Sequence, residues 1–284
     1  MEHSTRRLLA GLLLLANALP AAPPIKVHGH RGARASRPEN TIPAFEFAIS
    51  VGADVLEMDV SVTKDDVLVL SHDPRLNPEL CVGAEGRPAI RELTLEQLRR
   101  FDCGSKKLAL FPDQVPVPGT RIPTLDEVLA LAPRGNFGFN IETKISPKTP
   151  ELAPPPDKFA QLLAEVIQRN HLASRVIVQS FDYRTLHAMK KLLPQVRLSA
   201  LESQRQVSFV ELAREAGATI VSPHLKLVTP EKVAEAKRAG LEVAPWTANA
   251  PQEWDRLIQA GVDAMITDDP AGLIAFLKQH GYRR

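Results

Sequence analysis

The segment 55–60 carries two carboxylates on one face, where a buried strand would normally be apolar. Read as a β-strand, its side chains alternate between two faces, so Glu57 and Asp59 point the same way while the opposite face is entirely apolar. Strands flanked by helical segments usually belong to parallel sheets that are buried on both faces. Two buried carboxylates side by side are unfavourable unless a cation or hydrogen-bond donors offset their charge. The pattern therefore predicts a cation site.

Other side chains suited to chemistry follow other strand-like segments. They are His30, Arg31, His72, Glu142, Lys144 and Trp246. If the strands form a parallel barrel, their carboxyl ends meet at one rim, and these side chains converge there with Glu57 and Asp59. Three carboxylates, completed by Glu142, suit one hard divalent cation, Ca²⁺ or Mg²⁺, better than zinc, which favours histidine and cysteine ligands.

Basic and imidazole groups beside such a cation indicate phosphate chemistry. The Arg31 guanidinium and the Lys144 ammonium would bind phosphate oxygens. His30 and His72 would supply one general base and one general acid near neutral pH. The hypothesis from these residues is metal-assisted phosphoryl transfer.

Four residues near the ends of these strands have a structural interpretation instead of, or beside, a chemical one. We expect His28 to be structural, because a single histidine is more often that than a catalyst. Asp268 and Asp269 precede Pro270 and are typical of residues that cap a helix N-terminus. Trp246 would either close the core or contact the substrate.

Eight strand-like segments alternate with helix-like segments along the chain. The expected strands are 25–28, 55–60, 137–143, 176–179, 197–200, 219–221, 241–245 and 264–267. The segments between them repeat apolar residues with the 3.6-residue period of a helix, and the last three helices begin at Pro230, Pro251 and Pro270, which suits a first helical turn. Eight such units over about 260 residues match the size of a (β/α)₈ barrel.

Residues 73–124 interrupt this alternation. They are rich in proline and glycine, contain one modest helix pattern at 94–101, and follow an added strand at 66–71. We expect this segment to be an insertion over the barrel mouth, with the proline-rich stretch 146–156 as a second mouth loop. The chain has two cysteines, Cys81 and Cys103, both inside the insertion. They are either a disulfide or two buried free thiols.

The first 22 residues have the pattern of a secretory signal peptide. Arg6 and Arg7 precede a short apolar run that ends in small residues. We therefore expect an exported protein, periplasmic or secreted, in which residues 23–284 form the barrel domain. The run is short for a membrane span, so we expect no stable membrane insertion after cleavage, with an uncleaved anchor as the alternative.

The composition indicates that nucleic acid is not a partner, and it does not determine the oligomeric state. The formal net charge is +2, with both signs scattered, and aromatic residues are only 5% of the chain. There is no basic stripe and little material for stacking on bases, so we expect no nucleic-acid partner. The oligomeric state is not fixed by these features.

An ordered set of motifs runs through nearly the whole of segment 23–284. They are His30-Arg31-Gly32, Pro38-Glu39-Asn40-Thr41, Gly52-Ala53-Asp54, Glu57-Met58-Asp59-Val60, Thr63-Lys64-Asp65, His72-Asp73, Asn140-Ile141-Glu142-Thr143-Lys144, Gln179-Ser180-Phe181-Asp182 and Trp246-Thr247-Ala248-Asn249. Together they closely resemble the glycerophosphodiester phosphodiesterase family. The resemblance implies an α/β fold, a (β/α)₈ TIM barrel with a small inserted segment after the second strand.

The resemblance also implies roles for single residues. The acid–base histidines of the family fall on His30 and His72, and Glu39 matches its glutamate in the first loop. The carried-over metal ligands are Glu57, Asp59 and Glu142. The carried-over substrate contacts are Arg31, Lys144 and Trp246. One departure is His28, where an apolar residue would be more usual.

The implied activity is metal-dependent hydrolysis of a small glycerophosphodiester to sn-glycerol 3-phosphate and an alcohol. The glycerol 2-hydroxyl would attack first and form a cyclic phosphate. We favour His30 as the base and His72 as the acid, although the sequence does not fix this order. The alternatives are a lysophospholipase D that acts on longer lipids and a non-catalytic exported binding protein on the same barrel.

Overall fold

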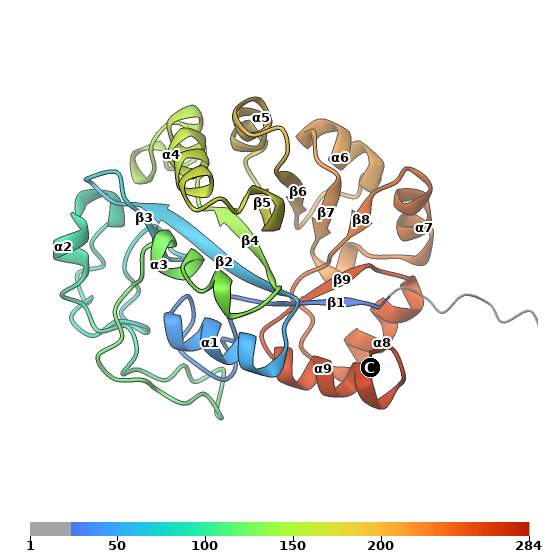
Figure 1. Ribbon diagram of the computed structural model, residues 1–284, viewed down its shortest axis with the longest axis horizontal. Helices are drawn as coiled ribbons and strands as arrows, with labels where there is room; N and C mark the ends of the chain where they lie inside the picture. The colour runs from blue at the N-terminus through green and yellow to red at the C-terminus, as the bar shows by residue number, and fades with distance from the viewer. Residues whose placement is uncertain (1–23, 284) are drawn as a thin grey trace, which may run out of the picture.

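A ring of parallel strands lies inside a layer of helices in the computed structural model, which describes residues 24–283 (Figure 1). The expected signal peptide, residues 1–22, lies outside the described part of the chain. The strands are β1 (Lys26–Gly29), β2 (Val55–Val62), β3 (Leu68–Leu70), β4 (Gly138–Thr143), β5 (Val176–Ser180), β6 (Arg197–Glu202), β7 (Ile220–Pro223), β8 (Glu242–Val243) and β9 (Ala264–Thr267).

The strand order confirms the predicted (β/α)₈ barrel. Parallel neighbours follow the order β8-β7-β6-β5-β4-β2-β1-β9, and β3 pairs with β2 from outside this path. The two ends of the sheet approach each other, where the Ile266 amide donates to the Pro245 carbonyl at 2.9 Å and the Ala248 amide donates to the Ile266 carbonyl at 3.0 Å. The barrel is therefore nearly closed, and all its strands point their carboxyl ends to one rim.

Helices cover the outside of the ring, and one further short helix, α2, lies in the insertion. They are α1 (Ile42–Val51), α2 (Leu95–Leu98), α3 (Leu125–Leu129), α4 (Pro156–Arg169), α5 (Tyr183–Leu192), α6 (Phe209–Ala216), α7 (Pro230–Arg238), α8 (Pro251–Ala260) and α9 (Pro270–Gln279). The last three begin at proline, as predicted, because the fixed φ of proline suits the first helical turn. No helix within residues 24–283 is long and apolar enough to cross a membrane.

The side chains of β2 alternate between the apolar core outside the barrel and the barrel interior, where the site lies. Leu56, Met58 and Val60 are fully buried in the apolar layer between strands and helices. The alternate side chains of β2, which include Glu57 and Asp59, point into the barrel. Near the beginnings of the strands the interior holds a small apolar cluster of Ile177, Ile220, Ala244 and Ala264. The polar groups of β2 lie further along the strand, toward the carboxyl rim.

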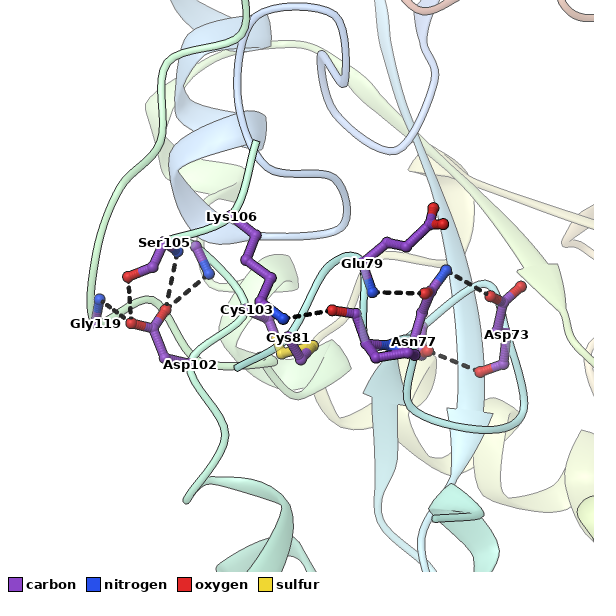
Figure 2. Close-up of a disulfide and its surroundings, with 12 residues drawn as sticks. Asp73, Asn77, Glu79, Cys81, Asp102, Cys103, Ser105, Lys106 and Gly119 are labelled. Carbon is purple, nitrogen blue, oxygen red and sulfur yellow. Dashed lines mark hydrogen bonds between the residues drawn. A yellow bond between two sulfur atoms is a disulfide. The ribbon is translucent and has the colours of Figure 1, made fainter. Parts of the chain in front are cut away.

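The segment 73–124 has a core of its own and lies beside β3 and α3, at the left of Figure 1. It contacts the loop after β1, because the Gln114 side-chain amide donates to the Arg34 carbonyl at 2.6 Å and the Val115 amide donates to the Ser36 carbonyl at 3.0 Å. The added strand predicted at 66–71 is present as β3, shorter than expected. Cys81 and Cys103 form a disulfide, which decides between the two alternatives (Figure 2).

Two short helices differ from the sequence prediction. The helix expected at 94–101 covers only α2, where Thr94 and Gln97 form a capping box. Helix α3 follows the insertion and was not predicted. Thr124 and Glu127 cap it in the same reciprocal way. Five residues are too few to show a helical period, so only the capping pattern marks this helix in the sequence.

Candidate active site

Three carboxylates meet at the carboxyl rim of the barrel. Glu57 and Asp59 come from β2, and Glu142 lies beside Asp59 in the register of the parallel pair β2–β4. One carboxylate oxygen from each lies within 4.8 Å of those of the other two, and all three residues are buried. The parity argument therefore identified two members of one cluster, and strand pairing supplies the third.

Burial and like charge set the protonation of this cluster. Burial, together with the charges of Asp59 and Glu142, raises the pKa of Glu57 well above its usual value. Burial acts on Asp59 in the same direction, but Arg31 and Lys144 outweigh it and hold the pKa of Asp59 low. Burial also favours a neutral Lys144, yet Glu142 and Asp59 raise the pKa of its ammonium. The cluster thus holds more negative charge than its protein cations neutralise comfortably.

Hydrogen bonds fix the carboxylates and leave oxygens free for a ligand. The Gln179 amide donates to Glu57 Oε1 at 2.9 Å, and the Asn40 amide donates to Asp59 Oδ2 at 2.9 Å. Within the described chain, Asp59 Oδ1 is buried without a hydrogen-bond partner, because the Lys144 ammonium, at 3.6 Å, is too far away to donate one. A buried carboxylate oxygen of this kind is strongly unfavourable unless it binds a cation. The donor set and this oxygen fit one divalent cation bound by oxygen ligands.

The loop after β1 carries Arg31 into the site on a rare backbone conformation. Arg31 has φ 51° and Asn40 has φ 54°, in the left-handed region that few residues other than glycine adopt. The Arg31 amide donates to Glu57 Oε2 at 2.8 Å, and its guanidinium donates to Glu39 at 2.6 Å and lies 3.2 Å from Asp59 Oδ2. These contacts hold a conformation that costs about 1–3 kcal/mol elsewhere, as is common at functional sites.

His30 has a buried acidic partner. Its Nδ1 lies 2.5 Å from Asp268 Oδ1, and its Nε2 lies 4.0 Å from Glu57 Oε2. Asp268 is held in turn by the Asn249 amide, which donates to Oδ2 at 2.8 Å. Burial lowers the pKa of His30, and Asp268 opposes this shift. Asp268 thereby fixes the ring so that Nε2 faces the carboxylates.

Asp268 and Asp269 were both predicted to cap helix α9, and the prediction is wrong for Asp268. Asp269 does cap α9, because its carboxylate accepts from the Gly272 amide at 2.9 Å. Asp268 does not cap the helix, since its carboxylate turns into the barrel mouth toward His30. The sequence offers the same N-cap pattern for both residues, and only closure of the barrel distinguishes them.

His72 lies just after β3 and lines a cavity together with Glu142 and Lys144. Its Nδ1 is 2.8 Å from Asp73 Oδ1, and the Asn77 amide donates to Asp73 Oδ2 at 3.2 Å. Its side chain is 37% exposed, whereas that of His30 is 12% exposed. The two histidines are thus built alike, each with an acidic partner on Nδ1, but His72 faces a more open space.

Trp246 is the last of the predicted site residues, and His28 is the histidine that was expected to be structural. Trp246 lies after β8, donates from its indole nitrogen to the Ser222 carbonyl at 2.9 Å, and meets the ring of Phe181 edge to face at 5.7 Å. Its side chain packs against Phe181 and is partly exposed, and a contact with the substrate stays a prediction. His28 is buried in the barrel, away from the carboxylates, and burial lowers its pKa to about 3. A neutral structural imidazole agrees with the expectation for His28.

Four polar residues that orient the site were not assigned from the sequence. They are Asn40, Gln179, Asn249 and Asp268. Gln179 is the last residue but one of β5 and so carried a positional signal. Asn40 and Asn249 lie in loops and belong to two of the motifs quoted above, but only the folded chain shows which carboxylate each of them contacts.

Comparisons with known proteins identify the family and the fold of the chain. The model of the glycerophosphoryl diester phosphodiesterase family matches residues 30–272. A glycerophosphodiester phosphodiesterase from Caldanaerobacter subterraneus subsp. tengcongensis is 34% identical over 255 residues, which are 90% of this chain and 98% of that protein. A crystal structure from Silicibacter pomeroyi DSS-3 is 29% identical, with a TM-score of 0.85 over 93% of this chain and 96% of that one.

A more distant structure shares the fold. The Oleispira antarctica phosphodiesterase, solved in complex with the product sn-glycerol-3-phosphate, is 24% identical, with a TM-score of 0.76 over 90% of this chain and 97% of that one. The family match covers the segment that holds every residue of the carboxylate cluster and both histidines. The chain therefore belongs to the glycerophosphoryl diester phosphodiesterase family.

Proposed function

We propose that this enzyme hydrolyses glycerophosphodiesters to sn-glycerol 3-phosphate and an alcohol by acid–base catalysis between His30 and His72. The observation that carries the proposal is the placement of both histidines at one buried carboxylate cluster, each with a carboxylate on Nδ1. His30 Nε2 lies 4.0 Å from Glu57 Oε2, and His72 lines the same cavity as Glu142. The product named for the Oleispira antarctica protein is the one expected of this reaction.

Glu57, Asp59 and Glu142 would hold one divalent cation, Ca²⁺ or Mg²⁺. When bound, the cation supplies positive charge to the non-bridging phosphate oxygens. Arg31 and Lys144 flank the same place and are held charged by the carboxylates, so they bind and orient the phosphate from two directions.

The surroundings of the two histidines support His30 as the general base and His72 as the general acid. Asp268 stabilises the imidazolium that forms when His30 Nε2 accepts the proton of the glycerol 2-hydroxyl. The 2-hydroxyl oxygen forms a bond to phosphorus, and the bond from phosphorus to the leaving oxygen breaks. His72, beside open space, donates its proton to that leaving oxygen. Water then opens the cyclic phosphate with the two histidines in exchanged roles.

The test is product release by purified enzyme and by its histidine variants. We expect His30→Ala and His72→Ala each to lower turnover of glycerophosphocholine by about 10²–10⁴-fold, measured as glycerol 3-phosphate formed. His187→Ala is the matched control, since His187 is exposed on α5, and it should retain activity. Chelation with EDTA should abolish turnover, and added Ca²⁺ or Mg²⁺ should restore it. Near-normal turnover in both active-site variants contradicts the assignment.

We also propose that the enzyme works outside the cytoplasm. The Cys81–Cys103 disulfide supports this, because such bonds persist mainly in oxidising compartments. A fusion of the first 30 residues to a reporter that folds only after export tests the proposal. Retention of the reporter inside the cell contradicts it.

A further inference from the structure

A cavity of about 280 Å³ opens beside His72 and Lys144. Its wall comes from three segments that meet at the rim of the barrel: the start of the insertion, the end of β4 with the loop that follows it, and the two residues after β5. Apolar side chains dominate it, and they are Pro74, Ile145, Pro147, Leu152, Ala153 and Phe181. The volume is near the lower end for small-molecule sites, which suits a short alkyl group.

The charged groups of this wall already have partners. The Asp182 carboxylate accepts from the Arg184 guanidinium, at 2.9 Å from Nε and 2.6 Å from Nη2. Glu142 accepts from the Lys144 ammonium at 2.6 Å. A ligand cation in the cavity would therefore meet one carboxylate, Asp182, that is paired with Arg184, and another, Glu142, that is assigned to the divalent cation. It would also lie close to the positive charge of Lys144.

Aromatic recognition of a cation is also poorly supported. Phe181 is the aromatic residue among those that line the cavity in the described chain, and its ring is engaged edge to face with Trp246. Quaternary ammonium groups are usually bound by several aromatic faces together. The wall thus lacks the features that would select a choline head group and has those that favour an apolar one.

The position of His72 connects this cavity to the reaction. In the proposed mechanism His72 protonates the leaving oxygen, and the phosphate lies toward Arg31, Lys144 and the carboxylates. An alcohol bonded to that oxygen must extend past His72, into the cavity that His72 itself lines. The glycerol part then lies on the His30 side.

We propose that this cavity binds the leaving alcohol and selects an uncharged alkyl group over choline or ethanolamine. The proposal rests on the proposed function, because it assumes that a glycerophosphodiester occupies the site. Leu152 and Ile145 are the residues that determine this preference, since both come from the loop after β4 and face the same space.

The first experiment compares glycerophosphodiesters of ethanol, butanol and hexanol with glycerophosphocholine. Each additional buried methylene should raise kcat/KM up to about fourfold until the cavity is filled. The hexyl diester should exceed glycerophosphocholine by about tenfold or more. A flat series, or a preference for choline, overturns the proposal. If no diester yields glycerol 3-phosphate, the proposed function itself fails, and the two failures are thus distinguishable.

The second experiment places a negative charge in the cavity. Leu152→Asp should lower kcat/KM for the hexyl diester and raise the choline-to-hexyl ratio by about tenfold or more. Leu192→Asp is the matched control, because Leu192 is 44% exposed at the end of α5, outside the cavity. Phe181→Ala, at a residue that is also 44% exposed, should weaken the alkyl preference without a folding defect. A ratio unchanged in both Leu152→Asp and Phe181→Ala overturns the proposal.

Discussion

Asp268 gives His30 a buried partner whose effect on the reaction is indirect. Its carboxylate touches the imidazole and the Asn249 amide, and it lies behind the ring as seen from the carboxylate cluster. Burial raises the pKa of Asp268, but His30 and Arg34 outweigh this and hold it low. A carboxylate that stays ionised there stabilises His30 when it carries a proton, so we assign Asp268 as a positioning residue.

Replacing Asp268 should therefore slow chemistry and spare binding. We expect Asp268→Asn to lower kcat roughly tenfold or more with KM nearly unchanged, because the substrate does not touch this residue. Asp269→Asn is the neighbouring control, and it should be close to normal, since asparagine also caps helices. Steady-state kinetics of both variants make the comparison. Equal kcat for Asp268→Asn and the unmodified enzyme would remove Asp268 from the mechanism.

Single residues of the site differ in how visible they are in the sequence. Glu57 and Asp59 were predictable because two acids on one face of an otherwise apolar strand have few explanations. Asp268 was not, because its contact with His30 joins residues 238 positions apart and its local pattern is that of a helix cap. Polar partners of this kind are fixed by barrel closure rather than by their own sequence neighbourhood.

At the scale of elements, strand β3, which precedes the insertion, determines where His72 lies. Antiparallel pairing of β3 with β2 continues to the Ser71 amide, which donates to the Asp59 carbonyl at 3.0 Å. This pairing brings the next residue, His72, to the carboxylate rim. Strand β3 could be predicted from its apolar run and the preceding turn. The path of the insertion could not, because its own core of Val69, Leu76, Ile90 and Leu98 has no regular period.

The disulfide connects this insertion to His72 through a short chain of contacts. The Cys81 amide donates to the Asn77 carbonyl at 2.9 Å, and Asn77 in turn holds Asp73, the partner of His72 (Figure 2). On the other side, Asp102 precedes Cys103 and accepts from the Gly104 and Gly119 amides at 2.9 Å. The bridge therefore joins the loop that orients His72 to a second ordered loop.

Removing the disulfide should destabilise the insertion and make the position of His72 less well defined. We expect the double variant Cys81→Ser, Cys103→Ser to lose up to about 3 kcal/mol of stability and to show a lower kcat. Dithiothreitol should move the unmodified enzyme toward the variant and leave the variant unchanged. Urea unfolding and turnover, each with and without reductant, measure this. Full activity of the variant at its normal stability would show that the bridge does not position His72.

At the scale of the whole molecule, the barrel interior changes character along its axis. The carboxylates, Arg31 and the histidines of the site occupy the carboxyl rim, and the apolar cluster of Ile177, Ile220, Ala244 and Ala264 fills the opposite part. His28 lies inside the barrel with its Nδ1 buried and, within residues 24–283, without a hydrogen-bond partner. The predicted barrel fold located the functional groups at the carboxyl rim. It did not explain His28, an imidazole inside the barrel where an apolar residue would be more usual, and the contribution of His28 can be measured as stability.

His28 should make the stability of the barrel depend on pH. Burial, with smaller contributions from Lys26 and Arg197, lowers its pKa in the folded state to about 3, while the unfolded chain has the ordinary value of about 6.5. Between these values only the unfolded chain binds the proton, so this stability is present above pH 6.5 and is lost as the pH falls. From pH 7 to pH 5 the loss from this residue should be about 2 kcal/mol. In His28→Leu this loss should disappear, so urea unfolding at both pH values should show a smaller decrease than in the unmodified protein. Equal decreases in the two proteins would mean that His28 takes up a proton inside the folded barrel.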